Sequence, residues 1–171
     1  MRRRGAVRDL AACAALVGLL QGCLYGFAGG GLPPHIRTVA ILPFDNQTAD
    51  PQLTQEVTDA VREAMERRLG LRVAGEETAD AVVRGSITRY EAEIPLSFQP
   101  GDATRDVQVT RRRVQLSVTV EIVDQRAGRP LWQRSGLTVD GEYDPPNEAA
   151  GRQVALRKLV SDIVDGAQSQ W

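Results

Sequence analysis

Few side chains in this sequence are of the types that carry out covalent or metal chemistry. His35 is the only histidine, and Cys13 and Cys23 are the only cysteines. A metal site requires several ligand atoms that converge on one point, and a lone histidine does not supply them. The glycines at 29–31 precede a predicted strand, whereas a phosphate-binding loop joins a strand to a helix. We therefore expect no catalytic residue, no metal and no cofactor, and a protein that is not an enzyme.

Arginines are the remaining candidates for binding chemistry. Arg111, Arg112 and Arg113 stand together at the start of one predicted strand, and Arg84 and Arg89 lie on another. A planar guanidinium can donate two parallel hydrogen bonds to a phosphate, which suits the headgroup of a phosphorylated glycolipid. The same arginines are also explained as solvated strand ends or as guards of a sheet edge against aggregation. The formal net charge of −1 provides no long-range field that would collect nucleic acid.

The N-terminus has the layout of an export signal. A basic segment with four arginines precedes an apolar run at residues 10–20, which is shorter than the roughly 20 residues that span a bilayer. The run ends at Leu20-Gln21-Gly22-Cys23, which resembles the lipobox of bacterial lipoproteins. We therefore predict a lipoprotein signal peptide at residues 1–22 and acylation of Cys23. The alternative is an ordinary signal peptide with a cysteine nearby.

Acyl chains on Cys23 would form an essentially permanent membrane anchor, because each buried methylene contributes about 0.8 kcal/mol. By resemblance to other lipoproteins, Leu24 after the cysteine favours sorting to the outer membrane, on its periplasmic side. The glycines and the Pro33-Pro34 pair that follow predict a lipidated flexible tether at residues 23–35.

Residues 36–171 are predicted to form a single α/β domain. A β-branched apolar run at 36–42 predicts a buried strand that ends at Pro43. Asp50-Pro51 predicts a helix start, and Gly70 its end. Between strand and helix, residues 45–48 are expected to form a connecting loop.

Three further strands and a helix complete the predicted domain. The strands are expected at about 81–94, 114–122 and 131–143, and the second of them alternates strictly between apolar and polar residues. The alternation shifts phase near position 110, where a bulge or loop is expected. A final helix begins after Asn147. Its predicted apolar side consists of Val154, Leu156, Leu159, Val160, Ile163, Val164 and Ala167.

This order predicts an α+β fold with two helices packed on one face of a four-stranded mixed, mostly antiparallel sheet. The first helix connects a parallel pair of strands, and the later strands form a meander. The opposite face of the sheet is left for solvent or for a partner.

Several segments resemble one family, the LPS-assembly lipoproteins of the LptE family. The similar segments are Cys23-Leu24-Tyr25-Gly26-Phe27, Leu32-Pro33-Pro34-His35-Ile36, Thr38-Val39-Ala40-Ile41, Phe44-Asp45-Asn46-Gln47-Thr48, Ala79-Asp80-Ala81 with Gly85 and Ile87, and Leu131-Trp132. The resemblance implies a periplasmic domain tethered to the outer membrane. It also implies an LptD-like outer-membrane barrel as partner and a role in delivering lipopolysaccharide to the cell surface. No arginine is carried over from the family, so the five arginines remain candidates for lipopolysaccharide on their chemistry alone.

A second interpretation comes from another class of envelope protein. The strand Val39-Ala40-Ile41-Leu42-Pro43-Phe44, followed by a helix that begins at Asp-Pro, also resembles curli-secretion and TolB-like periplasmic domains. Such proteins act as pores or scaffolds without handling lipid. Both interpretations remain open at the level of the sequence.

Overall fold

The computed structural model describes residues 32–100 and 107–169. The predicted signal peptide, Cys23 and most of the predicted tether lie outside these residues. The elements are β1 (Thr38–Ile41), β2 (Asp45–Asn46), α2 (Gln52–Leu69), β3 (Arg72–Val73), β4 (Ala81–Pro100), β5 (Val107–Asp124), β6 (Arg129–Tyr143) and α3 (Glu148–Ser169). Among the described residues, neither helix is long and apolar enough to cross a membrane.

Helix α2 begins and ends where the sequence predicts. The carboxylate of Asp50 accepts a hydrogen bond from the backbone N–H of Gln52 at 3.0 Å, and Pro51 already has helical dihedral angles. At the other end Gly70 takes the left-handed conformation, with φ 66°, and its N–H reaches the carbonyl of Met65. A residue without a side chain adopts this conformation at low cost, which explains the glycine.

The α+β class and the mixed sheet are confirmed, but the sheet has six strands rather than the four predicted. The strand order is β3-β1-β4-β5-β6. The short strand β2 lies outside this order and pairs with β4. Strands β2 and β3 are two residues long, and β2 lies within the expected loop at 45–48. Elements this short carry no recognisable period of alternation, so the pattern of residues did not indicate them.

Parallel and antiparallel pairing are distributed as predicted. Strand β1 runs parallel to both β3 and β4, with Ala40 opposite Val82. Strands β4, β5 and β6 form the antiparallel meander. The register of β4 and β5 shifts between the pairs Ser97–Arg111 and Phe98–Val109, so Thr110 is the extra residue of a bulge at the expected position.

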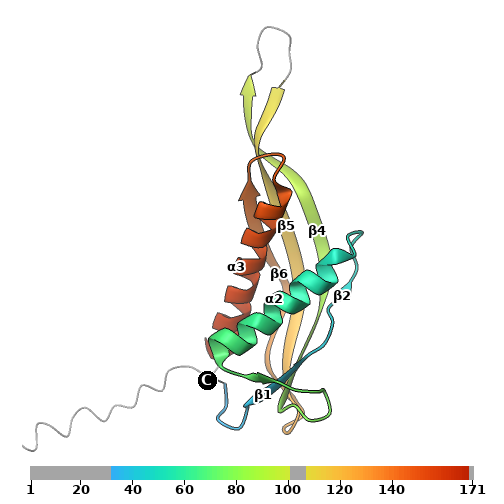
Figure 1. Ribbon diagram of the computed structural model, residues 1–171, viewed down its shortest axis with the longest axis vertical. Coiled ribbons are helices and arrows are strands. Elements are labelled where there is room, and N and C mark those ends of the chain that lie inside the picture. Colours follow the sequence, from blue (N-terminus) through green and yellow to red (C-terminus); the bar gives the residue numbers. More distant parts are fainter. Residues whose placement is uncertain (1–31, 101–106, 170–171) are drawn as a thin grey trace, which may run out of the picture.

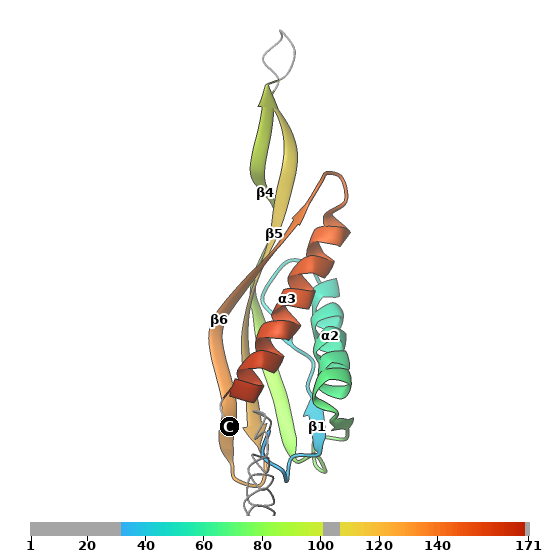
Figure 2. The same cartoon turned by 90° about the vertical axis from the view of Figure 1, so that its left-hand side faces the viewer.

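Both helices lie on the same face of the sheet (Figure 2). The paired ends of β4 and β5 continue past the helices as a projecting hairpin (Figure 1). The core lies between the helices and the sheet. Its largest fully buried side chains are Phe44, Leu53, Met65, Ile87, Leu116, Ile122, Leu159, Ile163, Val39, Val57, Val61 and Val83.

Candidate functional site

The sheet has a second surface, here called the outer face, which points away from the helices. Along β5, Val118 and Val120 are fully buried on the helix side, so Ser117 and Thr119 point to the outer face. The hydroxyl groups of Ser117 and Thr138 on β6 are hydrogen-bonded across the strands at 2.8 Å. The outer face of the meander is therefore polar.

Arg84 and Arg89 both lie on β4 and both hold ion pairs. The guanidinium of Arg84 lies 2.8 Å from the carboxylate of Glu121, its cross-strand neighbour on β5. Arg89 is paired with Ser117 in register, and its Nε contacts the Glu91 carboxylate at 2.9 Å. The positions of Glu121 and Ser117 on β5 differ by four residues, which separates the two arginines by about 13 Å along the sheet.

The three consecutive arginines are divided between the two faces of the sheet. Arg111 and Arg113 share the outer face with Gln115, because side chains alternate along a strand, and Arg112 points to the helix side. Arg112 contacts Glu93 at 3.0 Å. The sequence grouped all three as one cluster, but only two of them can meet the same ligand.

The two outer-face arginines of this group have carboxylates within reach. Arg113 lies 3.6 Å from Asp140, and Arg111 lies 3.4 Å from Glu142 and 3.7 Å from Asp144. The Nε of Arg113 is buried and has no hydrogen-bond partner among the described residues. Eight positions of β5 separate Arg113 from the partner of Arg84, roughly 26 Å, so the five predicted arginines form no single site.

His35 has a carboxylate partner that the sequence did not indicate. Its Nε2 lies 2.7 Å from Oδ2 of Asp124, at the end of β5, and this carboxylate is almost fully buried. Burial acts to raise the pKa of Asp124, but the backbone N–H groups of Ala127 and Arg126 and the bond to His35 outweigh it, so the pKa is lowered. The pair fixes the start of the domain to the β5–β6 turn.

An ion-pair cluster joins the first turns of the two helices. Arg152 of α3 contacts Asp50 and Glu56 at 3.0 Å each, and Glu148 at 3.8 Å. Tyr90 of β4 donates a hydrogen bond to Glu148 at 2.6 Å, and burial followed by this contact raises the pKa of Tyr90. The cluster holds α2, α3 and β4 together. Among the described residues no group of three histidine, cysteine or carboxylate side chains is placed to hold a metal.

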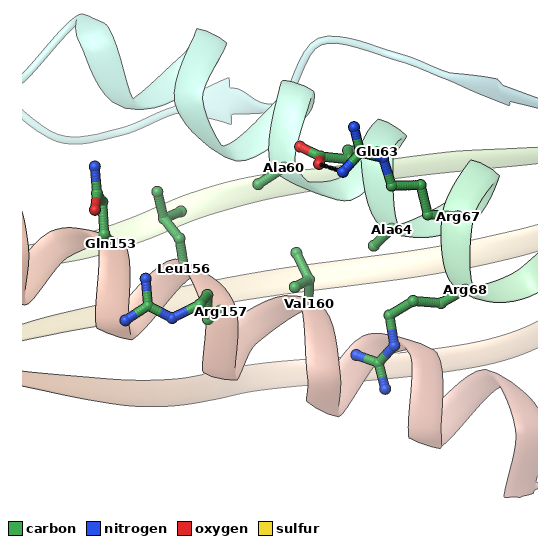
Figure 3. Close-up of a pocket in the computed structure, with 9 residues that line it drawn as sticks. All are labelled: Ala60, Glu63, Ala64, Arg67, Arg68, Gln153, Leu156, Arg157 and Val160. Atoms are coloured by element: carbon green, nitrogen blue, oxygen red, sulfur yellow. Dashed lines mark ion pairs between the residues drawn. The ribbon is translucent and has the colours of Figure 1, made fainter.

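The helix side carries an apolar groove between α2 and α3. Leu156 and Val160 point from α3 toward Ala60 and Ala64 of α2 (Figure 3). The groove has a volume of about 330 Å³, and its polar lining consists of Glu63, Arg67, Arg68, Gln153 and Arg157. Leu156 and Val160, which belong to the predicted apolar side of the last helix, pack against the core but are only partly buried. The buried side of α3 also includes Gly151 and Ala155, which the prediction left out.

The sequence pattern of the lipopolysaccharide-assembly family LptE matches residues 36–167, which include every strand and nearly all of both helices. The chain belongs to the LptE family. This confirms the family resemblance. Among curated proteins, none matches this LptE-family chain in sequence.

Solved structures share the fold at low sequence identity. The PelC dodecamer from Paraburkholderia phytofirmans superposes with a TM-score of 0.50 at 14% identity, covering 77% of this chain and 92% of that chain. Protein XCC0632 from Xanthomonas campestris superposes with a TM-score of 0.51 at 14% identity, covering 82% and 90%. At such identities the likeness concerns the fold alone.

The sequence did not indicate the groove of this LptE-family chain. Arg67 and Arg68 have a simpler explanation at the sequence level, because basic residues are favoured in the last turn of a helix. Arg157 and Lys158 form a short basic pair with nothing in the local pattern to connect it to α2. One feature of the sequence could have indicated the groove, namely the width of the apolar side of α3. Leu156 and Val160 make this apolar side wider than the part of the helix surface that the sheet covers.

Proposed function

We propose that this chain is an outer-membrane lipoprotein, anchored through Cys23, which pairs with an LptD-like barrel protein and helps to deliver lipopolysaccharide to the cell surface. The observation that carries the proposal is membership of the lipopolysaccharide-assembly family over residues 36–167. The protein would act by binding and assembly, without catalysing a reaction.

The outer face and the projecting hairpin favour a large partner. The helices cover only one face of the sheet, so the outer face of β4, β5 and β6 is available for contact (Figure 2). Several charged pairs on this face, such as Arg84–Glu121 and Arg113–Asp140, bridge neighbouring strands and leave little net charge. We infer that the barrel is held by area and shape, so removing one arginine barely weakens the complex.

Arg84, Arg89, Arg111 and Arg113 of the outer face are proposed to bind phosphates of lipopolysaccharide at separate points, and Arg112, on the helix side, is expected to contribute least. Each of them contacts a carboxylate in the absence of ligand. Exposed ion pairs contribute about 0–1 kcal/mol, so a phosphate can replace the carboxylate at low cost.

A pore or scaffold role, as in curli-secretion and TolB-like domains, is the second candidate. The observation that favours it is the fold shared with PelC from Paraburkholderia phytofirmans, which is described as a dodecamer. The two candidates differ in the partner they require. A scaffold requires that the chain binds further copies of itself, whereas a role in lipopolysaccharide assembly requires that it binds a barrel protein.

Purification from cross-linked outer membranes, followed by mass spectrometry of protein and lipid, tests the proposal. We expect a barrel protein and lipopolysaccharide to be recovered with the chain. Recovery of multimers of the chain without any barrel would support the scaffold instead. The Cys23→Ala variant is the control, because it is expected to leave an unacylated chain that does not fractionate with the outer membrane.

A further inference from the structure

We propose that the groove between α2 and α3 binds the acyl chain of an amphiphile, with the anionic headgroup of that lipid held by Arg157 and its neighbours. The groove lies on the helix side, away from the arginines of the outer face. The inference goes beyond the proposed function and does not depend on a barrel partner, so either can fail alone.

The floor of the groove is apolar and incompletely covered. Leu156 and Val160 lie against the core but remain partly exposed, and the two alanines opposite leave space above them (Figure 3). Covering such a surface with hydrocarbon is favourable in proportion to the apolar area removed from water. The volume of about 330 Å³ lies at the lower end of the range for small-molecule sites.

The polar lining of the groove is predominantly positive. Three arginines line it and one carboxylate, Glu63, while Arg68 contacts Asp165 of α3 at 3.2 Å. Arg157 has no ion pair among the described residues. Arg67 contacts Glu63 at 2.7 Å, and both side chains are more than half exposed, so this pair is weak and can exchange for an anionic headgroup. A guanidinium without a carboxylate partner is the strongest reason to expect an anion here.

Charge along the helical layer differs between its two ends. The neighbouring hollow toward the first turns of the helices is lined by Glu56 and Asp59, with Arg152 held by several carboxylates. The excess positive charge is confined to the C-terminal half of α2 and the adjacent turns of α3. A headgroup would therefore lie over Arg157, which projects from α3 beside Gln153 (Figure 3).

The size of the groove favours a lipid over a helix from another protein. The lining residues of α2 run from Ala60 to Arg68, which corresponds to about 12 Å of helix. A stable protein interface buries about 800 Å² on each partner, far more than two helical turns present. A single hydrocarbon chain matches a groove of this length.

Isothermal titration of the full chain with dodecyl phosphate below its micelle concentration tests the inference. The chain carries Cys23→Ala so that no attached acyl chain competes. We expect one site, with Arg157→Gln weakening binding about fivefold because a charge-assisted hydrogen bond is lost. Ala60→Leu fills the groove from a half-buried position and is expected to weaken binding about tenfold. Arg62→Gln removes the same charge from α2, outside the groove, and leaves binding unchanged.

Two further probes separate the chemical contributions. Inorganic phosphate lacks the chain and dodecyl maltoside lacks the charge, and both are expected to bind at least about tenfold more weakly than dodecyl phosphate. Equal binding of inorganic phosphate would place the affinity in the headgroup alone. Equal binding of the maltoside would remove the role of the arginines. Either result overturns the inference. So does an absence of binding, or binding that neither Arg157→Gln nor Ala60→Leu weakens while both variants unfold at the wild-type temperature.

Discussion

The backbone of Gly141 in β6 lies directly against that of Gly151 in α3. A Cβ atom added at Gly141 would overlap the carbonyl oxygen of Gly151 and lie 2.8 Å from the backbone nitrogen of Ala155. One added at Gly151 would meet Tyr143 at 2.7 Å. The two glycines therefore set the distance between α3 and the sheet. They also fix the position of the wall of the groove that α3 forms.

Gly141→Ala is expected to destabilise the domain by more than about 2 kcal/mol, because the neighbouring atoms are backbone and cannot move aside locally. The measurement is the free energy of unfolding in urea. Gly75→Ala is the matched control, since a Cβ there meets only the Thr78 hydroxyl oxygen at 3.8 Å, and it should change stability by less than about 0.5 kcal/mol. Equal stability of the two variants would contradict the close approach of α3 and β6.

Asp50 has two separable roles, as the acceptor at the start of α2 and as a partner of Arg152. Asp50→Ala removes both and is expected to cost about 1–2 kcal/mol in urea unfolding. Asp50→Asn keeps a side-chain oxygen for the N–H of Gln52 and removes the charge, so it should cost about half as much. If the two substitutions cost the same, the hydrogen bond at the helix start contributes nothing.

Arg152 neutralises several carboxylates that converge on it, and its side chain is only 17% exposed. Arg152→Met preserves the aliphatic length and is expected to cost about 1–3 kcal/mol, because Asp50, Glu56 and Glu148 would repel one another without it. Arg62→Met removes a solvent-exposed cation of α2 as the control, with a cost below about 1 kcal/mol. The difference between the two should shrink when Arg152→Met is measured at low pH, where the carboxylates are protonated.

The pairing of Asp124 predicts a loss of stability in acid. The pKa of Asp124 is lowered in the folded protein, against burial, by the N–H groups of Ala127 and Arg126 and by His35. As pH falls below the ordinary carboxyl pKa of about 4, the unfolded chain binds the proton first, so the folded state loses stability until the folded pKa is passed. Unfolding temperatures measured from pH 7 to pH 3 should fall less steeply for Asp124→Asn than for the wild type.

This part of the loss of stability is expected to come from Asp124 and not from exposed carboxylates. Asp162→Asn changes an exposed carboxylate of α3 and should leave the slope of the wild type intact. A wild-type slope in Asp124→Asn as well would show that the contacts of Asp124 do not stabilise the domain. Asp80, whose pKa is lowered by the backbone N–H of Arg37 and by Thr38, is expected to contribute in the same direction.

Local features of the fold could be predicted, and long-range partners could not. Asp50-Pro51, Gly70 and the extra residue at Thr110 follow from capping rules and from alternation, which involve neighbours in the chain. The partner of His35 lies 89 residues away, and nothing in either local pattern connects the two.

The candidate site divides in the same way. The alternation of side chains along the strand already predicts that Arg111 and Arg113 point to the same face of the sheet. Their carboxylate partners, however, lie on β6 and beyond its end. The strand register that brings them close is set by the whole meander. The groove depends on the spacing of two helix axes. The position of α3 over the sheet follows from contacts such as the one between Gly141 and Gly151, which no single-segment pattern encodes.

The division of the arginines between the two faces changes the prediction for lipopolysaccharide. Arg111 and Arg113 share the outer face, and Arg112 points to the helix side toward Glu93. If phosphates bind at the outer face, replacing Arg111 and Arg113 together by serine should weaken binding by at least about tenfold, because charge-assisted hydrogen bonds are lost. Arg112→Ser alone should change it by less than about twofold, because this side chain points to the other face of the sheet.

Isothermal titration of lipopolysaccharide into the full Cys23→Ala chain at two salt concentrations measures both effects. Added salt should weaken binding to the wild type more than to the double variant, since screening acts on the charges that the double variant lacks. An equal loss in Arg112→Ser and in the double variant would place the ligand around the base of the hairpin, in contact with both faces. Binding that neither substitution nor salt affects would remove the arginines from the proposal and leave the family assignment as it stands, because that rests on residues 36–167 as a whole.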